Sequence, residues 1–272
     1  MIPEGESANA VSRIPGPMDL TERLGLIGAV SLRYPELTGI ALSGDAEPAA
    51  VRADKSCGSS HVCAGSLVSI AAGICDEHRD DVLDSTLFAQ FAANGRYQRD
   101  TQTDQWYSVY VQTLNLLGWN TVGFRFQKYA HLPEQFQLYD TILELTSGLW
   151  TKSAQDSLTA MLRALGGLKS TDRRIQLLGG SSVAASAGNF QLGVAENAKS
   201  DQIQMQTMAV LFNSQGIPAD FLFDRYTAAS MNLFVSSQTM ALNDNIYSRM
   251  RSTVRSRLNT QISQFIVTIP LS

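Results

Sequence analysis

The sequence predicts an α+β protein in which an antiparallel β-meander packs against a helical layer. Apolar residues follow helical spacing through most of residues 80–180, and from residue 189 the spacing changes to alternation. A last apolar stripe with four-residue spacing follows residue 243, which predicts a C-terminal amphipathic helix. Because short polar turns join the alternating segments, we expect antiparallel neighbours and not strands joined by helical crossovers.

The composition divides the chain into three parts. Residues 1–18 contain three prolines and no periodicity, so they are expected to form a flexible leader. A mainly helical region follows at residues 19–180, and residues 181–272 hold the sheet and the C-terminal helix. Since 272 residues suffice for one large core, we expect the second and third parts to form one compact unit.

The helical region contains recognisable start and stop residues. Asp80 or Asp81 is expected to begin a helix that ends at residues 94–95, and Thr151 or Ser153 to begin another. Further helices are expected within residues 19–34, 103–117, 133–145 and 171–178. Short strands are expected at residues 37–42 and 119–126.

Alternation after residue 189 predicts four strands. In the first, Phe190, Leu192 and Val194 share one face, and Asn189 and Gln191 share the other. The remaining strands are expected at residues 202–212, from residue 221, and at 231–242, with a helix as the alternative for the last of these.

The last helix is expected to begin at Asn243 or Asp244. Its apolar stripe should pack on the sheet, while its arginines flank the stripe or face water. The stripe consists of Ile246, Met250, Val254, Leu258 and Ile262. Residues 265–271 are expected to add a closing strand.

Bulk composition excludes two classes of protein. Apolar residues make up 44% of the chain and charged residues 17%, which fits neither a disordered chain nor a membrane-spanning one. An uncharged stretch at residues 62–75 is shorter than a membrane-spanning helix and is expected to be a buried helix or strand, or an interfacial segment. The N-terminus lacks the pattern of a signal peptide, so we expect a cytoplasmic protein or one exported by another route.

Charge is unevenly distributed along the chain. Residues 225–272 carry five arginines and one acid, whereas residues 76–84 hold five acids. This asymmetry predicts that the basic C-terminus docks on the acidic segment, within the chain or between chains. The basic patch is too small to indicate nucleic-acid binding, and no nucleic acid is expected as a partner.

All three cysteines and two of the three histidines lie within 22 residues, which makes this segment the main candidate site. The residues are Cys57, His61, Cys63, Cys75 and His78. Thiolate and imidazole are the ligands that zinc prefers, so the segment is a candidate zinc site, although its spacing does not match the usual pairs. The alternative is that Cys63 and Cys75 are small buried apolar residues.

Two further interpretations of the same segment stay open. Cys57 is a candidate catalytic nucleophile with His61 as its base, because Gly58 allows close backbone approach. Alternatively, Cys57, Cys63 or Cys75 carries a fatty acyl group, since a cysteine beside a short apolar segment suits S-acylation.

No other catalytic pattern is present in the sequence. There is no G-x-S-x-G elbow, and the small residues at 179–188 lack the lysine and the context of a phosphate-binding loop. No cofactor is therefore expected apart from the candidate zinc ion, and the sequence favours a non-enzymatic protein.

The strand block at residues 189–242 resembles that of the Cyt-type cytolysins. The resemblance is carried by the order of elements: NFQLGVAEN, DQIQMQTMAVLF, DFLFDRYTA and MNLFVSSQTMAL follow a run of helices. It implies a helical layer that leaves the sheet at a lipid surface, after which the strands insert or assemble. No motif of the family matches, so no functional residue is carried over.

These observations favour a non-enzymatic, toxin-like or virulence-type protein that acts by membrane association or self-assembly. Its expected partners are a lipid membrane or a fatty acyl group, and further copies of the chain as a homo-oligomer. The alternatives are a structural or interaction protein without membrane activity, and a cysteine-dependent enzyme or zinc protein centred on residues 57–78.

Overall fold

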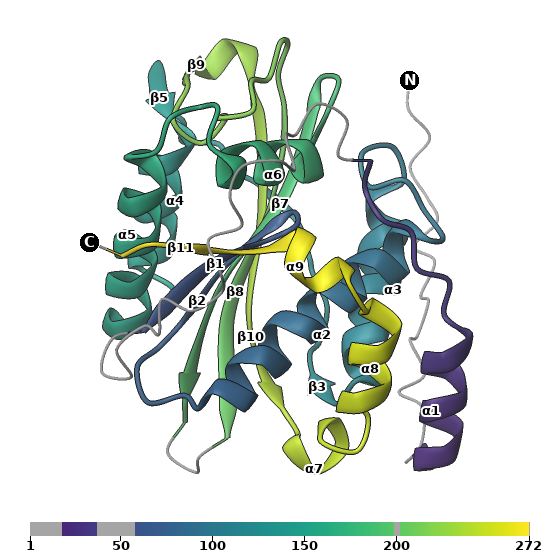
Figure 1. The fold of residues 1–272 in the computed structure, drawn as a ribbon. Coiled ribbons are helices and arrows are strands. Elements are labelled where there is room, and N and C mark those ends of the chain that lie inside the picture. Colours follow the sequence, from purple (N-terminus) through teal and green to yellow (C-terminus); the bar gives the residue numbers. More distant parts are fainter. Residues whose placement is uncertain (1–17, 37–57, 199–201, 272) are drawn as a thin grey trace.

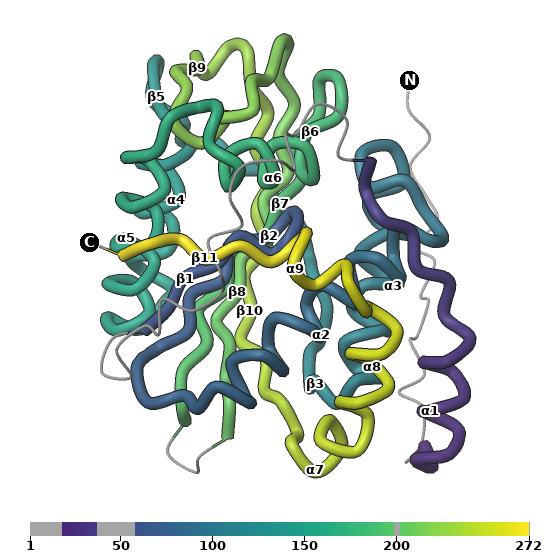
Figure 2. Tube along the Cα trace, in the orientation of Figure 1, coloured from purple at the N-terminus to yellow at the C-terminus, as the bar shows by residue number. Residues whose placement is uncertain are grey.

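The computed structural model describes residues 18–36, 58–198 and 202–271 and forms three layers. A central sheet lies between helices on both of its faces, with α2, α3 and α8 on one side and α4 and α5 on the other (Figures 1 and 2). The mixed, mostly antiparallel sheet and its helices confirm the predicted α+β fold. The single helical layer of the prediction is replaced by two.

The main sheet is built from strands of very different length. Its members are β1 (Ser59–Cys63), β2 (Ser66–Ile70), β3 (Trp119–Asn120), β4 (Gln127–Lys128), β6 (Val183–Ala184), β7 (Ala187–Asn197), β8 (Ile203–Asn213), β10 (Asn232–Leu242) and β11 (Ile266–Ile269). They run in the order β11-β1-β2-β7-β8-β10-β3, while β4 also pairs with β10 and β6 with β7. A second, small sheet pairs β5 (Gln135–Gln137) with β9 (Arg225–Thr227).

The helices occupy the chain before β7 and after β10. They are α1 (Leu20–Ala29), α2 (Asp76–Asn94), α3 (Thr103–Leu116), α4 (Leu138–Ser147), α5 (Lys152–Gly166), α6 (Arg173–Ser182), α7 (Asp244–Tyr247), α8 (Arg251–Leu258) and α9 (Gln261–Phe265), with a 3-10 turn at Ala228–Ser230. The predicted cap of α5 is confirmed, because the Thr151 side chain accepts a hydrogen bond from the Ala154 amide.

The uncharged stretch at residues 62–75 forms most of a buried hairpin. Strands β1 and β2 pair antiparallel through a two-residue turn in which Ala64 has a φ of 49°. Gly65 completes the turn, and a Cβ atom there would lie 1.9 Å from Nη1 of Arg99. The side chains of residues 62–70 are buried, which confirms the core interpretation of this part of the stretch.

The hairpin joins the sheet by the one pairing that alternation could not predict. Strand β2 lies parallel to β7, whereas β7, β8 and β10 follow one another antiparallel as expected. The predicted closing strand is also confirmed, because β11 pairs with β1 at the edge of the sheet.

Several predicted elements differ from the structure. Residues 221–223 form a turn, because the Phe223 amide bonds to the Asp220 carbonyl, and the expected third strand is absent there. The strand expected over residues 119–126 is limited to β3. Helix α2 begins at Asp76, one turn earlier than expected, and residues 135–137 form β5 before α4 starts. The strand expected at residues 37–42 lies outside the described residues.

The C-terminal helix is interrupted and packs elsewhere than predicted. It is divided into α7, α8 and α9, and Asn259 has a φ of 47° at the break after α8. The stripe residues Met250, Val254 and Leu258 are buried, so the helix is amphipathic as expected. However, α8 packs on α2 and α1 and not on the sheet, because α2 already covers that face.

Candidate functional site

On the face of the sheet under α2 and α3, the central residues have polar or small side chains. Two rows of residues lie in register across β7, β8 and β10, and the residues between them, which point to the other face, are apolar on β7 and β8 and a serine, Ser237, on β10. We call them the polar rows: Gln191, Ala209 and Ser236 in one, and Gly193, Thr207 and Gln238 in the other.

Hydrogen bonds show that α3 covers the polar rows at Gln191, whereas the segment between β3 and β4 covers them on β10, where Ser236 Oγ accepts from the Arg125 amide and Gln238 Oε1 from the Thr121 hydroxyl. Tyr107 on α3 donates from its hydroxyl to Asn189 Oδ1 at 2.6 Å, and Gln191 Nε2 donates to the same hydroxyl at 3.0 Å. Asn189 and Gln191 are two residues apart on β7 and so point to the same side. Burial raises the pKa of Tyr107 to about 12, so this hydroxyl is a neutral donor and acceptor.

The opposite face of the same strands is apolar at the centre of β7 and β8. Phe190 and Leu192 on β7 and Val210 on β8 are buried there. Helix α5 contacts this side near the strand ends, where the Thr151 amide donates to Gln206 Oε1 at 2.9 Å. Trp150 Nε1, just before α5, also donates to Ser237 Oγ on β10 at 3.1 Å, so this face makes hydrogen bonds to its helices as well but is more apolar on β7 and β8.

Arg99 extends the polar contacts between the α2–α3 link and the sheet. Its Nη2 donates to Gln191 Oε1 at 2.8 Å and to the Gly65 carbonyl at 3.2 Å. Gln90 on α2 holds the same turn, because its Oε1 accepts from the Gly65 amide at 3.0 Å and its Nε2 donates to the Cys63 carbonyl. The helical layer is thus joined to the sheet by side-chain hydrogen bonds.

Ion pairs hold α8 against the outer side of α2. Arg251 bonds Asp81 through two atoms, and Arg255 bonds both Asp84 and Asp80 at 2.8 Å. The predicted docking of the basic C-terminus on the acidic segment is therefore confirmed within one chain. Burial raises the pKa of Asp84 to about 6, against the opposing effect of Arg255.

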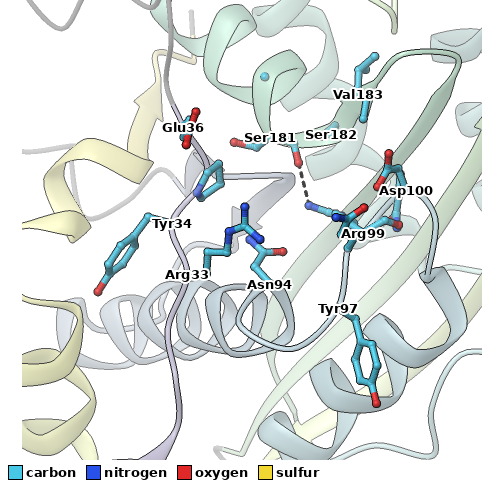
Figure 3. Close-up of a pocket in the computed structure, with 15 residues that line it drawn as sticks. Arg33, Tyr34, Glu36, Asn94, Tyr97, Arg99, Asp100, Ser181, Ser182 and Val183 are labelled. Carbon is cyan, nitrogen blue, oxygen red and sulfur yellow. Dashed lines mark hydrogen bonds between the residues drawn. The ribbon is translucent and has the colours of Figure 1, made fainter.

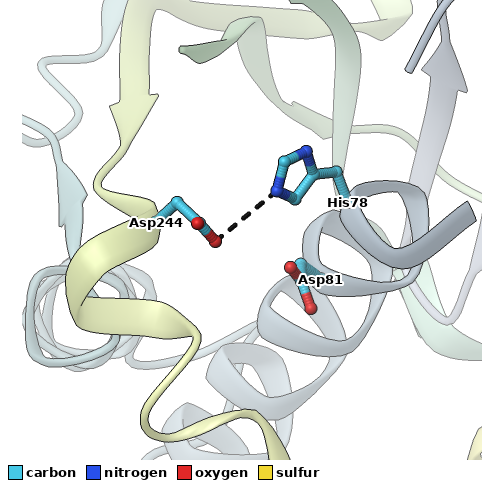
Figure 4. Close-up of side chains that lie close together, drawn as sticks. All are labelled: His78, Asp81 and Asp244. Carbon is cyan, nitrogen blue, oxygen red and sulfur yellow. Dashed lines mark ion pairs between the residues drawn. The ribbon is translucent and has the colours of Figure 1, made fainter. Parts of the chain in front are cut away.

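One group of potential metal ligands occurs among the described residues. His78, Asp81 and Asp244 place one donor atom each within 4.8 Å of one another, and His78 Nε2 lies 3.5 Å from Asp244 Oδ1 (Figure 4). Arg251 bonds Asp81 and also contacts Asp244 at 3.5 Å. The guanidinium already supplies the positive charge here, so the group does not require a metal.

The structure places the sequence-predicted site residues in separate surroundings. His61 and Cys63 lie on β1, Cys75 precedes α2, and His78 lies on its first turns. Among the described residues, these four do not come together as a group of three metal ligands. Cys57 lies outside the described residues, so the zinc, nucleophile and acylation interpretations that include it stay predictions.

Cys63 is held as a neutral thiol between the sheet and α2. Its Sγ donates to the Leu83 carbonyl at 3.6 Å, and its side chain has no solvent contact. Burial raises the pKa of this thiol far above its usual range. Cys75, in contrast, is exposed.

His61 is also buried and neutral. It contacts Ser59 Oγ at 3.0 Å and Thr268 Oγ1 at 3.4 Å. Burial, with a contribution from nearby Arg79, lowers the pKa of His61 to about 4. This imidazole is therefore uncharged at neutral pH.

The fold resembles that of Cyt-type delta-endotoxins. A delta-endotoxin structure aligns at a TM-score of 0.38 and 7% identity, over 66% of this chain and 81% of the other. The activated Cyt2Ba monomer from Bacillus thuringiensis subsp. israelensis aligns at 0.37 and 11% identity, over 66% and 97%. The structure of the Evf virulence factor aligns at 0.31 and 8% identity, over 75% and 84%.

The resemblance stated from the strand block is confirmed at this level, as a likeness of structure at low sequence identity. No family model and no curated protein sequence matches the chain. Within the described ranges, none of the helices combines the length and the apolar character that crossing a membrane requires.

Proposed function

We propose that this protein is a non-enzymatic, toxin-like protein that acts on a lipid membrane. In this proposal α2 and α3 move off the sheet at the lipid surface, and strands β7, β8 and β10 then contact lipid or one another in an assembly. The proposal rests on the difference between the two faces of these strands. The polar rows occupy the face under the helices that are proposed to move.

The polar rows favour opening on the α2–α3 side. Apolar burial stabilises a contact by about 25 cal/mol per Å², and small polar side chains such as Ser236 and Thr207 supply little apolar area. The hydrogen bonds of Tyr107 and Arg99 can be exchanged for hydrogen bonds to water, so each contributes only about 1 kcal/mol net. Exposing Phe190 and Leu192 on the other face would cost much more free energy, because their side chains are large and apolar. We therefore expect α4 and α5 to stay in place.

Strand length fits the same proposal. Strands β7, β8 and β10 each contain 11 residues and pair in continuous antiparallel register. A tilted strand needs roughly 9–11 residues to cross the hydrocarbon core of a bilayer. The three strands are therefore long enough to cross once the helical layer has left them.

A vesicle assay tests the activity. The protein is expected to sediment with liposomes and to release an entrapped dye at micromolar concentration. Absence of both binding and leakage would contradict the proposal. It would favour the alternative of an interaction protein without membrane activity, which light scattering over a range of salt concentrations would then examine.

Cys63 provides a direct probe of the proposed movement. In a variant with Cys57→Ser and Cys75→Ser, Cys63 is the remaining thiol and is buried under α2. Its alkylation rate is expected to rise with vesicle concentration, because lifting α2 exposes it.

A matched variant separates local lifting from general unfolding. Ser66 is the cross-strand partner of Cys63, so their side chains point to the same face of the hairpin. Ser69 is buried and lies three positions further along β2, so its side chain points to the opposite face. Ser69→Cys in a chain whose native cysteines are serine should stay protected in the presence of vesicles. Equal exposure of both thiols would show global unfolding and overturn the proposed movement.

A further inference from the structure

A cavity of about 300 Å³ lies where three segments of the chain meet (Figure 3). The segment after α1 contributes Arg33, the α2–α3 link contributes Arg99, and the end of α6 contributes Ser181 and Ser182. Its size is at the lower end of the range for small-molecule sites in proteins.

The inner wall of the cavity contains a cation whose hydrogen-bond acceptors are all neutral. The Arg99 guanidinium donates to the carbonyls of Ser181 and Gly65 and to the amide oxygens of two glutamines, and it lies 4.5 Å from the centroid of the Trp106 ring. None of these acceptors is a carboxylate. Burial without a counter-charge is costly for an ion, and it lowers the pKa of Arg99.

Unpartnered polar atoms gather at the same wall. Arg99 Nε, Ser181 Oγ and Ser182 Oγ are buried and have no hydrogen-bond partner among the described residues. Ser182 as a whole is 5% exposed. Buried polar groups in proteins are normally satisfied, so three such atoms around one cavity point to a missing partner that accepts hydrogen bonds.

The outer part of the cavity carries charges of both signs. Arg33 is exposed there, and so are the carboxylates of Glu36 and Asp100. Solvent screens these exposed charges, whereas the charge of Arg99 lies behind them in lower dielectric. The potential is therefore most positive at the inner end, beside the serines.

We propose that this cavity binds a phosphate group, with Arg33 and Arg99 supplying charge and Ser181 and Ser182 supplying hydroxyl donors. A phosphate accepts hydrogen bonds on several oxygens in different directions, which fits donors that come from three segments. The group belongs either to a free phosphate ester or to a lipid with an exposed phosphomonoester. The proposal is independent of the proposed membrane action, because the free ligand is tested without vesicles.

Calorimetric titration with inorganic phosphate and with glycerol phosphate tests the site in solution. Because Arg33 is exposed, Arg33→Gln should leave the fold intact, and it is expected to weaken binding about tenfold by removing a charge-assisted hydrogen bond. Ser182→Ala should weaken it less. Glu36→Gln should tighten binding, because it removes a negative charge from the rim.

A second arm distinguishes the source of the phosphate. Vesicles that contain phosphatidic acid are compared with vesicles of phosphatidylcholine alone, and the same three variants are used. The site is assigned to a lipid if the protein prefers phosphatidic acid, loses this preference in Arg33→Gln and binds free esters weakly. It is assigned to a soluble ester if free esters bind tightly and the vesicles show no preference. The proposal is overturned if no phosphate compound binds, or if all three variants bind like the unaltered protein.

Discussion

Arg251 on α8 holds the carboxylate of Asp81 on α2 through two hydrogen bonds, Nε to Oδ1 at 2.6 Å and Nη2 to Oδ2 at 2.7 Å. The Asp81 side chain has no solvent exposure, and that of Arg251 is 17% exposed. The pair joins the C-terminal segment to the helix that covers the sheet. It is one place where the charge asymmetry of the sequence becomes a specific contact.

Arg251→Gln is expected to lower the free energy of unfolding by about 3–5 kcal/mol, because it leaves a buried carboxylate without its partner. Urea unfolding followed by circular dichroism measures this change. Arg249→Gln is the matched control, since Arg249 is exposed, and it should shift stability by less than about 0.5 kcal/mol. Similar effects of the two substitutions would contradict the role given to the pair.

The carboxyl of Asp84 should make the fold relatively more stable in mild acid. Its folded-state pKa is raised from 3.8 to about 6, so between these values the folded chain binds a proton that the unfolded chain releases. The contribution of Asp84 therefore increases as pH falls through 6, by at most about 3 kcal/mol. Asp84→Asn should remove it, so this variant should lose stability relative to the unaltered protein on going from about pH 7 to about pH 4.

Urea midpoints over this pH range measure the effect. Asp104→Asn, at an exposed position, should leave the pH dependence unchanged. If Asp84→Asn and the unaltered protein keep the same difference at every pH, the carboxyl does not have a raised pKa in the folded state.

His61 should act in the opposite direction over the same range. Its folded-state pKa is lowered from 6.5 to about 4, so in this window the unfolded chain binds a proton that the folded chain does not. The contribution of His61 falls as pH falls, again by at most about 3 kcal/mol. His61→Asn should therefore gain stability in acid relative to the unaltered protein, whereas His131→Asn, at an exposed histidine, should not.

Much of the fold could be predicted because local periodicity carries it. The alternation of Phe190, Leu192 and Val194 predicted β7, and the strand at residues 231–242 was predicted almost to its ends. The parallel pairing of β2 with β7 could not be predicted, since it joins segments more than a hundred residues apart. Residues 221–223 were wrongly predicted as a strand because an apolar run as short as this has the same pattern in a buried turn.

The candidate site was less accessible to sequence reasoning. The acidic cluster and the C-terminal arginines were visible as charge, so their docking was predicted, although not which arginine meets which carboxylate. Arg99 carried no signal, because its significance comes from acceptors in the β1–β2 turn and on β7, α2 and α6, most of which are distant in sequence. Of the polar rows, the sequence predicted only that Gln191 lies on the polar face of its strand. Which residues lie beside it on β8 and β10 depends on the register between strands, and that is a property of the folded sheet.

Two helical glycines should respond to alanine in opposite ways. In α6, a Cβ atom at Gly179 would lie 2.7 Å from the carbonyl oxygen of Ala219, so Gly179→Ala is expected to cost about 1–3 kcal/mol through overpacking. In α1, a Cβ atom at Gly25 would meet nothing within 4 Å, so Gly25→Ala should stabilise the protein by about 0.5–1 kcal/mol. Urea unfolding measures both, and an effect of the same sign at the two positions would contradict the close approach at Gly179.

Tyr107→Phe tests whether the polar contacts control the separation of the helical layer from the sheet. The substitution keeps the ring and removes the hydroxyl that joins α3 to Asn189 and Gln191, so it should cost about 1–3 kcal/mol. Because the loss falls at the surface that opens in the proposed movement, vesicle-dependent alkylation of Cys63 should also become faster. Tyr139→Phe is the control, since no hydrogen bond of its hydroxyl occurs among the described residues. Slower or unchanged labelling in Tyr107→Phe, despite lower stability, would show that the layer does not leave the sheet at the polar rows.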